Sequence, residues 1–321
     1  MSIWVLQTIT DGGKIAGYCL KNNVVAMGWS INDAHVADWV AEDKCDEVKQ
    51  KRKFIESYED YRALVEEYNI YVNKKGNVDI SNIKRLCKDF KYDDLVWMRY
   101  DGKYYLGRYT NESVWIYNCN EEALGKDVAN QVTSIDWFKV GDESDVPGAI
   151  ISSLIAKQTF HRCWADGVDV ISKMLYNKEK GYEHYKNLVV DKSKDAFYTA
   201  LSPTNCEDLL CMWLYVNKGY VCIPSTNKIS TELYECVLVD PVDGKRIYPQ
   251  VKNSIEDLDA TPYKKLDGEV WLFTTKGKVV NNEDCTCVNV AEPEVLFEFA
   301  MSDAAKNVLP TTILKWVELF K

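Results

Sequence analysis

Residues 201–252 constrain the fold more than any other stretch of the chain, because their pattern predicts one helix followed by three strands. Apolar residues recur through 206–215 often enough for a well-buried helix. Thr204 stands just ahead of them with Glu207 three residues later, which is the spacing of a capping box at a helix start. The three strands are expected at residues 220–224, 234–239 and 246–252. An Asp-Gly pair at 243–244 provides turn chemistry, so the last two strands are predicted to form a hairpin.

Four polar residues of this stretch suggest a catalytic site. They are Glu207 near the helix start, Glu235 at the opening of the second strand, and Gln250 and Lys252 on the third. Because side chains alternate along a strand, Gln250 and Lys252 share a face, and the hairpin is expected to bring Glu235 opposite them. Two carboxylates and an amide oxygen form an oxygen-rich pocket of the kind that Mg²⁺ binds, usually with several waters retained. A nearby lysine would orient or deprotonate the attacking water and stabilise a pentavalent phosphate, which is the chemistry of phosphodiester hydrolysis.

The order helix-Glu, strand-acid, hairpin and Gln-x-Lys resembles the PD-(D/E)xK nuclease core over roughly residues 195–280. In particular it is similar to the Mrr-type branch of restriction endonucleases, in which Gln replaces the second acid. The resemblance implies that Glu235 is the metal-binding acid, Gln250 the second metal ligand and Lys252 the catalytic lysine. It also implies that Glu207 is the acid of the helix. Glu stands where the family usually has Asp, and the glycine-rich run that usually precedes this acid is missing.

A purely structural interpretation of the same residues stays open. Gln-x-Lys occurs on strands by chance, and Glu207 would then serve only as part of a helix cap. The departures from the family pattern also leave open a nuclease-like fold that binds nucleic acid without cutting it.

Composition limits the class of protein. The 321 residues suggest two domains, and 46% hydrophobic with 12% aromatic residues are ample for folded cores. A net charge of −10 argues against a nonspecific polyanion binder but is compatible with a local basic groove. No run reaches the roughly 18 apolar residues that a membrane-spanning helix needs, and the first residues do not resemble a signal peptide. The eleven cysteines and three histidines show no metal-binding spacing, so a cytoplasmic protein with reduced thiols and no membrane partner is expected.

Residues 1–140 are expected to form a separate β-rich domain. Strands are predicted at 3–9 and 18–29, a turn at 10–13, helices at 58–68 and 80–90, and further strands at 114–118 and 127–141. The Asp-Gly pair at 101–102 lies between apolar runs and is a strong hairpin signal within residues 94–110. A strand that ends in Gly28-Trp29, then helices, then these hairpin strands resembles PUA-like domains of the EVE and ASCH kind.

Such domains resemble readers of modified bases, which hold a flipped base in an aromatic-lined pocket. A pocket of this kind needs stacking faces and a polar group for the edge of the base. The candidate walls are Trp29, Trp97 and Trp115, and the candidate polar partner is Asn130. Each tryptophan has an alternative role in the core, because a Trp on an alternating strand is more often buried than exposed to a ligand.

The remaining residues complete an α+β fold class. Residues 141–194 are interpreted as a connector, and 195–321 as the nuclease-like domain. Further strands are expected at 269–274 and 288–290, followed by two closing helices that are separated near Pro310. The expected architecture is an N-terminal PUA-like β-barrel with helices and a C-terminal α/β restriction-endonuclease-like domain with a mixed central sheet.

Together the two halves predict a modification-dependent DNA endonuclease of prokaryotic defence, with Mg²⁺ as cofactor. Double-stranded DNA with a modified base would be its partner, and a homodimer is expected because one site per chain has to cut two strands. The alternatives are a catalytically inactive nucleic-acid-binding protein with a nuclease-like fold, and an interaction protein whose aromatic residues serve only the core.

Overall fold

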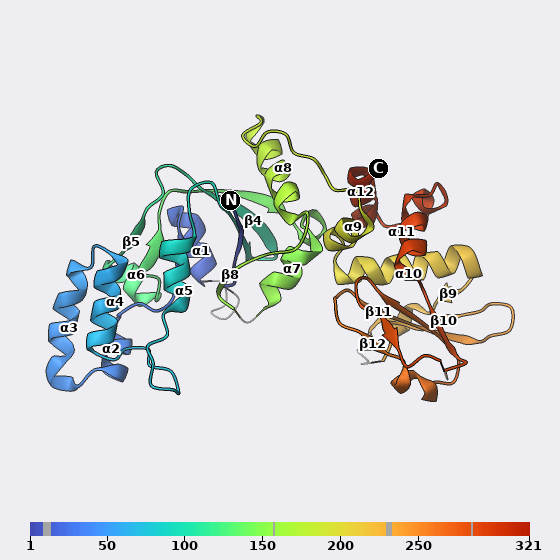
Figure 1. The fold of residues 1–321 in the computed structure, drawn as a ribbon, viewed down its shortest axis with the longest axis horizontal. Coiled ribbons are helices and arrows are strands. Elements are labelled where there is room, and N and C mark those ends of the chain that lie inside the picture. The colour runs from blue at the N-terminus through green and yellow to red at the C-terminus, as the bar shows by residue number, and fades with distance from the viewer. Residues whose placement is uncertain (9–13, 157, 229–232, 284) are drawn as a thin grey trace. The chain divides into compact units, whose positions relative to one another are not determined.

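The computed structural model describes residues 1–8, 14–156, 158–228, 233–283 and 285–321. The turn expected at 10–13 lies outside them. The chain divides into two compact units. The first comprises Met1–Val146, Ile150–Trp164 and Ser172–Lys186, and the second comprises Pro147–Ala149, Ala165–Ile171 and Asn187–Lys321. Figure 1 labels many of the elements of both units. The class is mixed α and β, as expected.

A five-stranded mixed sheet forms the centre of the first unit, in the order β7-β4-β3-β1-β8. Its strands are β1 Ile3–Leu6, β3 Leu95–Tyr100, β4 Lys103–Tyr109, β7 Ile135–Gly141 and β8 Phe160–Arg162. Strand β1 pairs in parallel with β3 and antiparallel with β8. Asp101 and Gly102 have φ angles of 48° and 68° and join β3 to β4, so the predicted hairpin is confirmed.

A second sheet of the first unit has three strands, in the order β2-β6-β5. They are β2 Val25–Met27, β5 Trp115–Tyr117 and β6 Asn130–Val132. The described strands of this unit therefore form two open sheets, and they do not close into the barrel that was expected. The chain passes from β6 to β7 through Ser134, whose φ of 52° interrupts the extended backbone at the point where one ladder ends and the other begins.

Helices of the first unit surround these sheets. They are α1 Lys14–Asn22, α2 Asp33–Trp39, α3 Cys45–Lys51, α4 Tyr58–Glu67, α5 Ser81–Lys84 and α6 Glu121–Gly125, with most of α7 Gly148–Ile155 and α8 Val168–Lys180. The prediction of a turn and strand over 18–29 is wrong for its first half, because α1 includes Tyr18. Ala16 and Cys19 are buried three residues apart on one helical face, a period that a strand would not give.

The segment predicted as a connector contributes to the packing of the first unit. Within 141–194, strand β8 extends the sheet along β1, and the Phe160 ring stacks on Trp4 at a centroid distance of 4.6 Å. From α8, the Ser172 hydroxyl accepts a hydrogen bond of 3.0 Å from the indole of Trp97. The first unit therefore extends well beyond residue 140.

The second unit is built on a five-stranded mixed sheet in the order β15-β13-β11-β10-β9. The strands are β9 Val221–Cys222, β10 Leu238–Val239, β11 Arg246–Lys252, β13 Glu269–Thr274 and β15 Val288–Val290. Strands β9, β10 and β11 are antiparallel, whereas β11, β13 and β15 run parallel. The mixed sheet predicted for this half is therefore present. A small parallel pair accompanies it, β12 Leu258–Asp259 with β14 Val279–Val280.

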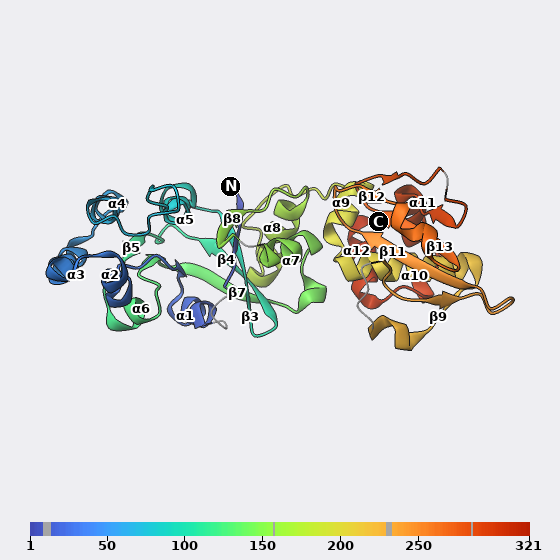
Figure 2. The same ribbon diagram turned by 90° about the horizontal axis from the view of Figure 1, so that it is seen from below.

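Helix α10, Pro203–Lys218, packs against β11 (Figures 1 and 2). It begins at Ser202, which forms a capping box with Asn205, and it ends at Gly219, whose φ is 75°. The predicted helix is thus confirmed, but Thr204 and Glu207 do not form its capping box. Glu207 lies within α10, and its side chain takes no part in the cap.

Strand β10 is shorter than the predicted 234–239, and Pro249 gives the physical reason. The pairing of Leu238 with Ile247 would, if continued, place Cys236 opposite Pro249. Proline has no N–H to donate to the ladder. The backbone N–H of Glu235 donates instead to the Pro249 carbonyl at 2.9 Å, which shifts the pairing by one residue. The irregularity lies directly at a predicted site residue.

Three helices complete the second unit, α9 Lys194–Ala200, α11 Pro293–Met301 and α12 Thr311–Phe320. The Phe197 ring packs edge-on against Phe297 and Phe320, which joins the three helices in one cluster. Pro310 is the N-cap of α12, so the predicted break between the closing helices is confirmed. None of the helices in the described ranges is both long enough and apolar enough to span a membrane.

Candidate functional site

The predicted catalytic residues come from three elements of the second unit. Glu207 lies on α10, Glu235 just before β10, and Gln250 and Lys252 on β11. The amide nitrogen of Gln250 donates to the Glu235 carboxylate at 2.8 Å, so the hairpin does bring these two side chains together. The backbone N–H of Val251 also donates to the Glu235 carboxylate.

The negative charge of Glu235 also acts on Glu207. Burial, the negative charge of Glu235 and that of Asp208 raise the pKa of Glu207 to about 7. Burial also raises the pKa of Glu235, although its hydrogen bonds from Val251 and Gln250 act in the opposite direction. Within the described part of the chain, neither Glu207 nor Glu235 forms an ion pair. Two half-buried carboxylates without a counter-ion favour the uptake of a proton or a cation.

Lys252 lies two residues after Gln250 at the end of β11. Its side chain is 40% exposed, and its ammonium forms an ion pair of 2.9 Å with Glu256. Glu256 was not among the predicted residues, although its position four residues after Lys252 is a signal that the sequence contains. A bound phosphate would have to draw the ammonium away from this exposed carboxylate.

The donor atoms suit Mg²⁺ better than a transition metal. The described residues include no group of three or more His, Cys, Asp or Glu side chains that could hold a metal ion. The group here has two carboxylates, from Glu207 and Glu235, and one amide, from Gln250. Mg²⁺ typically takes one or two carboxylates and keeps several waters, so this oxygen set fits it. The amide of Gln250 presents its nitrogen to Glu235, and a half-turn of the amide would present its oxygen instead.

Three thiols lie beside the two acids. The Sγ atoms of Cys211 on α10 and of Cys236 are 3.8 Å apart. Cys236 also interacts with Cys222, and hydrogen bonds from the two neighbouring thiols lower its pKa. Cys211 is one helical turn from Glu207, and Cys236 directly follows Glu235. The sequence gives no local signal for this cluster, because its members are far apart in the chain.

The four predicted base-binding residues separate into two groups. Trp97 is fully buried, and its indole donates to Ser172, so it is a core residue of the five-stranded sheet. Trp115 is half-buried on β5, and its indole nitrogen has no hydrogen-bond partner among the described residues. The structure therefore does not place Trp97 on the wall of a pocket.

Trp29 and Asn130 do lie together. The carbonyl of Trp29 accepts from the amide of Asn130 at 3.0 Å and from the hydroxyl of Tyr61 at 2.7 Å. Trp29 has a φ of 64°, an unfavourable conformation for a bulky residue that typically marks a functional constraint. Asn130 is fully buried, and its side-chain oxygen has no partner in the described ranges. A buried acceptor without a partner is rare and calls for an explanation such as a bound water or a ligand.

Polar groups that the sequence did not reveal contact the backbone of Ser30, next to Trp29. The carbonyl of Ser30 accepts from the hydroxyl of Tyr71 at 2.6 Å, and the Nδ1 atom of His35 is 2.8 Å from the same carbonyl. The backbone N–H of Ser30 donates to Asp127 at 2.8 Å, and burial raises the pKa of that carboxyl. Aromatic and polar groups therefore converge on the backbone of Trp29 and Ser30.

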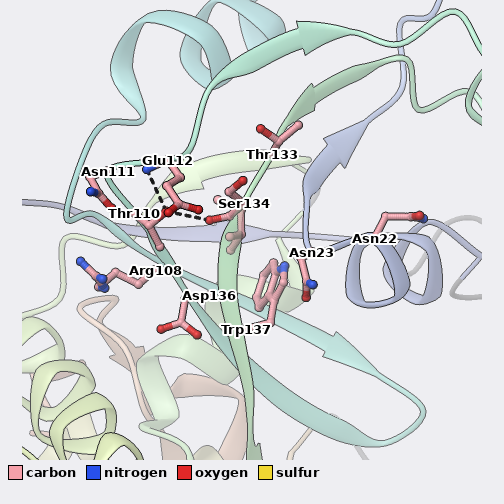
Figure 3. A pocket seen from close by; sticks show the side chains of 11 residues that line it. Asn22, Asn23, Arg108, Thr110, Asn111, Glu112, Thr133, Ser134, Asp136 and Trp137 are labelled. Atoms are coloured by element: carbon pink, nitrogen blue, oxygen red, sulfur yellow. Dashed lines mark hydrogen bonds between the residues drawn. The ribbon is translucent and has the colours of Figure 1, made fainter.

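A pocket of about 620 Å³ lies elsewhere in the first unit and contains none of the predicted residues (Figure 3). Its lining includes Arg108, Asp136 and Trp137. Arg108 pairs with Asp93 at 3.1 Å, and Asp136 pairs with Lys180 at 2.7 Å. Because both charges are already compensated, this pocket is a weaker candidate than the group around Glu235.

Comparison of the chain with protein families, with curated proteins and with solved structures finds no match.

Proposed function

We propose that this protein is a Mg²⁺-dependent endodeoxyribonuclease of prokaryotic defence that cuts duplex DNA after its first unit has recognised a modified base. The observation that carries the proposal is the group formed by Glu207, Glu235 and Gln250, with Lys252 two residues further along the same strand. Mg²⁺ there would be held by the two carboxylates and by Gln250.

The topology of the second unit supports the proposal. A helix and an antiparallel three-strand meander follow one another in the order that the PD-(D/E)xK resemblance implies, and β13 then pairs in parallel with β11. The crossover from β11 to β13 contains β12 and the 3-10 turn Thr261–Lys265 in place of a long helix. The acids lie on α10 and before β10, and Lys252 is the last residue of β11.

The residues of the chain have separable roles in this proposal. When bound, Mg²⁺ would polarise a phosphoryl oxygen and lower the pKa of a bound water. Glu207 has to lose its proton before it can bind a cation, and its pKa of about 7 makes this step dependent on pH in the neutral range. Lys252 leaves Glu256 and stabilises the negative charge that develops on the phosphate.

Recognition of the base is proposed for the surroundings of Trp29 and Asn130. The ring of Trp29 offers a stacking face, and the buried oxygen of Asn130 would accept a hydrogen bond from the edge of a flipped base. Trp115 is the third candidate, because its indole nitrogen is a donor without a partner among the described residues.

The proposal is tested by cleavage of duplexes of one sequence that contain cytosine, 5-methylcytosine or 5-hydroxymethylcytosine, with Mg²⁺ or with EDTA. We expect cutting of a modified duplex only, with Mg²⁺ only, and a loss of at least about 100-fold in rate for Glu235→Gln and Lys252→Ala. Lys306→Ala is the matched control, because it also removes an exposed ion pair, that of Lys306 with Asp303 at 2.6 Å in the same unit.

The outcomes separate the alternatives. Binding of a modified duplex without cutting, by wild type and variants alike, would identify an inactive nucleic-acid-binding protein. No binding to any nucleic acid would leave an interaction protein. Equal cutting by wild type and Lys252→Ala would refute the proposed site. Cleavage of both strands requires two copies of the site. Light scattering of the protein bound to DNA is therefore expected to show a dimer.

A further inference from the structure

A smaller pocket of the first unit, of about 370 Å³, combines cationic and aromatic side chains. It lies between strand β8 and a π-helical turn, Arg85–Asp89, that follows α5. Arg85 and Asp89 line it from the turn, and Arg162 and Trp164 from β8 and the residues just after it. None of these residues belongs to the groups around Glu235 or Trp29.

The π-helical turn is itself an unusual feature. The backbone N–H of Phe90 donates to the carbonyl of Arg85 at 3.0 Å, which closes a five-residue turn in place of the usual four. Such turns are rare and occur frequently at functional sites, because the extra residue changes the direction of side chains. Here both ends of the turn, Arg85 and Asp89, contribute to the same pocket.

The two guanidinium groups give the pocket an excess of positive charge over its single carboxylate. Arg85 donates to the side-chain oxygen of Asn82 at 2.9 Å and to the carbonyl of Phe160 at 3.5 Å, and the side-chain oxygen of Gln158, with its amide turned by half a turn, accepts from Arg85 as well; all three acceptors are uncharged. In the part of the chain that the structure describes, neither Arg85 nor Arg162 forms an ion pair. The Nε atom of Arg162 is buried without a hydrogen-bond partner there. The two cations outnumber the one carboxylate of the pocket, that of Asp89, and in a chain of net charge −10 this local excess of positive charge favours an anionic ligand.

Aromatic rings fix the position of Arg162 and leave a stacking surface. Its guanidinium lies 4.8 Å from the ring centroid of Trp4 and 5.4 Å from that of Trp164. Trp4 is buried, whereas Trp164 is 76% exposed. The indole of Trp164 therefore offers area to a planar partner beside the arginines.

Guanidinium groups bind phosphate oxygens in a bidentate manner, and exposed indoles stack on nucleobases. A phosphate with an attached base satisfies both features, and the volume is large enough for one nucleotide unit. We propose that this pocket binds a single unstacked nucleotide of a nucleic-acid strand, with its phosphate on Arg85 and Arg162 and its base on Trp164. Asp89 is then placed to accept a hydrogen bond from an exocyclic amino group of the base.

This inference rests on the proposed function only in taking nucleic acid as the partner. It is tested with full-length protein in EDTA, by fluorescence anisotropy of a labelled single-stranded oligonucleotide across a range of salt concentrations. Trp164→Ala is expected to weaken binding about 5- to 100-fold, which corresponds to the loss of one stacked base. Arg85→Gln is expected to reduce the slope of log affinity against log salt by about one.

Each variant has a matched control in the same unit. Phe54 is also 76% exposed, so Phe54→Ala removes an equally exposed aromatic ring. Arg62 is 57% exposed and pairs with Glu66, so Arg62→Gln removes a guanidinium that already has a counter-ion. Both controls are expected to bind like the wild type. Circular dichroism spectra that match the wild type would show that Trp164→Ala and Arg85→Gln are folded.

Wild-type affinity and salt dependence in Trp164→Ala and Arg85→Gln would overturn the inference, and so would a wild type that binds no oligonucleotide. The result is distinguishable from failure of the proposed function. If Trp164→Ala lost binding while the wild type bound but never cut, the pocket would stand and the nuclease would fall. If the wild type cut DNA and Trp164→Ala bound normally, the nuclease would stand and the pocket would fall.

Discussion

Replacing Glu207 by glutamine is expected to make the second unit more stable at alkaline pH and to leave its stability unchanged at acidic pH. The pKa of Glu207 is raised from an ordinary value of 4.5 to about 7 by burial, by Glu235 and by Asp208. Below pH 4.5 the carboxyl is protonated in both the folded and the unfolded chain and contributes nothing. Between pH 4.5 and 7 the folded chain binds more protons, so stability falls as the pH rises. Above pH 7 the carboxyl is ionised in both states, and the full free-energy cost of the half-buried charge is present.

The magnitude of this destabilisation follows from the difference between the two pKa values of Glu207. One pH unit corresponds to 1.36 kcal/mol, so the cost of ionised Glu207 is at most about 3.4 kcal/mol. Glu207 is only half-buried, and solvent screening reduces the figure to about 1.5–2 kcal/mol. Glutamine keeps the shape of the side chain and carries no charge. The variant is therefore expected to gain about 1.5–2 kcal/mol in free energy of unfolding at pH 8 and to match the wild type at pH 4.

Urea denaturation followed by circular dichroism at the two pH values measures this difference. Glu298→Gln, which changes an exposed glutamate on α11, is the control and should have little effect at either pH. Addition of Mg²⁺ at pH 8 is expected to stabilise the wild type and to stabilise Glu207→Gln less, because a cation relieves the same repulsion. A variant that is less stable than the wild type at pH 8, or a gain that is equal at both pH values, would refute the reasoning.

Two further predictions concern the packing of each unit. Gly148→Ala places a Cβ atom in a clash with the Leu201 carbonyl oxygen, so we expect a loss of about 3 kcal/mol in free energy of unfolding, whereas Gly125→Ala, with open space around it, should stay within about 1 kcal/mol. Asp94→Ala removes the buried acceptor of the Trp4 indole at 2.9 Å and should cost about 3 kcal/mol. Urea denaturation checks both, and a wild-type midpoint for Gly148→Ala or Asp94→Ala would contradict the packing described.

Much of the local structure could be predicted from the sequence because its signals are local. The Asp-Gly pair at 101–102 requires left-handed backbone, and Pro310 cannot continue a helix, so both elements end where expected. The extent of α1 and β10 could not be predicted in the same way. The extent of α1 depends on which of its faces packs against the sheet. The extent of β10 depends on the missing N–H of Pro249 in the neighbouring strand.

The same distinction between local sequence signals and long-range packing applies to the candidate site. Contact between Glu235 and Gln250 followed from a hairpin whose turn is visible in the sequence. The raised pKa of Glu207 depends on how α10 packs against β11, and the pairing of β1 with β3 joins residues as distant as Val5 and Trp97. No short motif encodes such contacts, because they depend on packing between segments that are far apart in the sequence.

The closeness of Cys211 and Cys236 has a practical consequence for handling the protein. Their Sγ atoms are 3.8 Å apart, and small side-chain rotations would bring them to the roughly 2.05 Å of a covalent bond. A peroxide would take one hydrogen from each thiol and leave as water, and the new bond would tie α10 to the segment before β10. A preparation stored without reductant is therefore expected to lose two titratable thiols. Thiol titration alongside each activity assay would show whether a sample is inactive because these thiols are oxidised or because the protein itself has no activity.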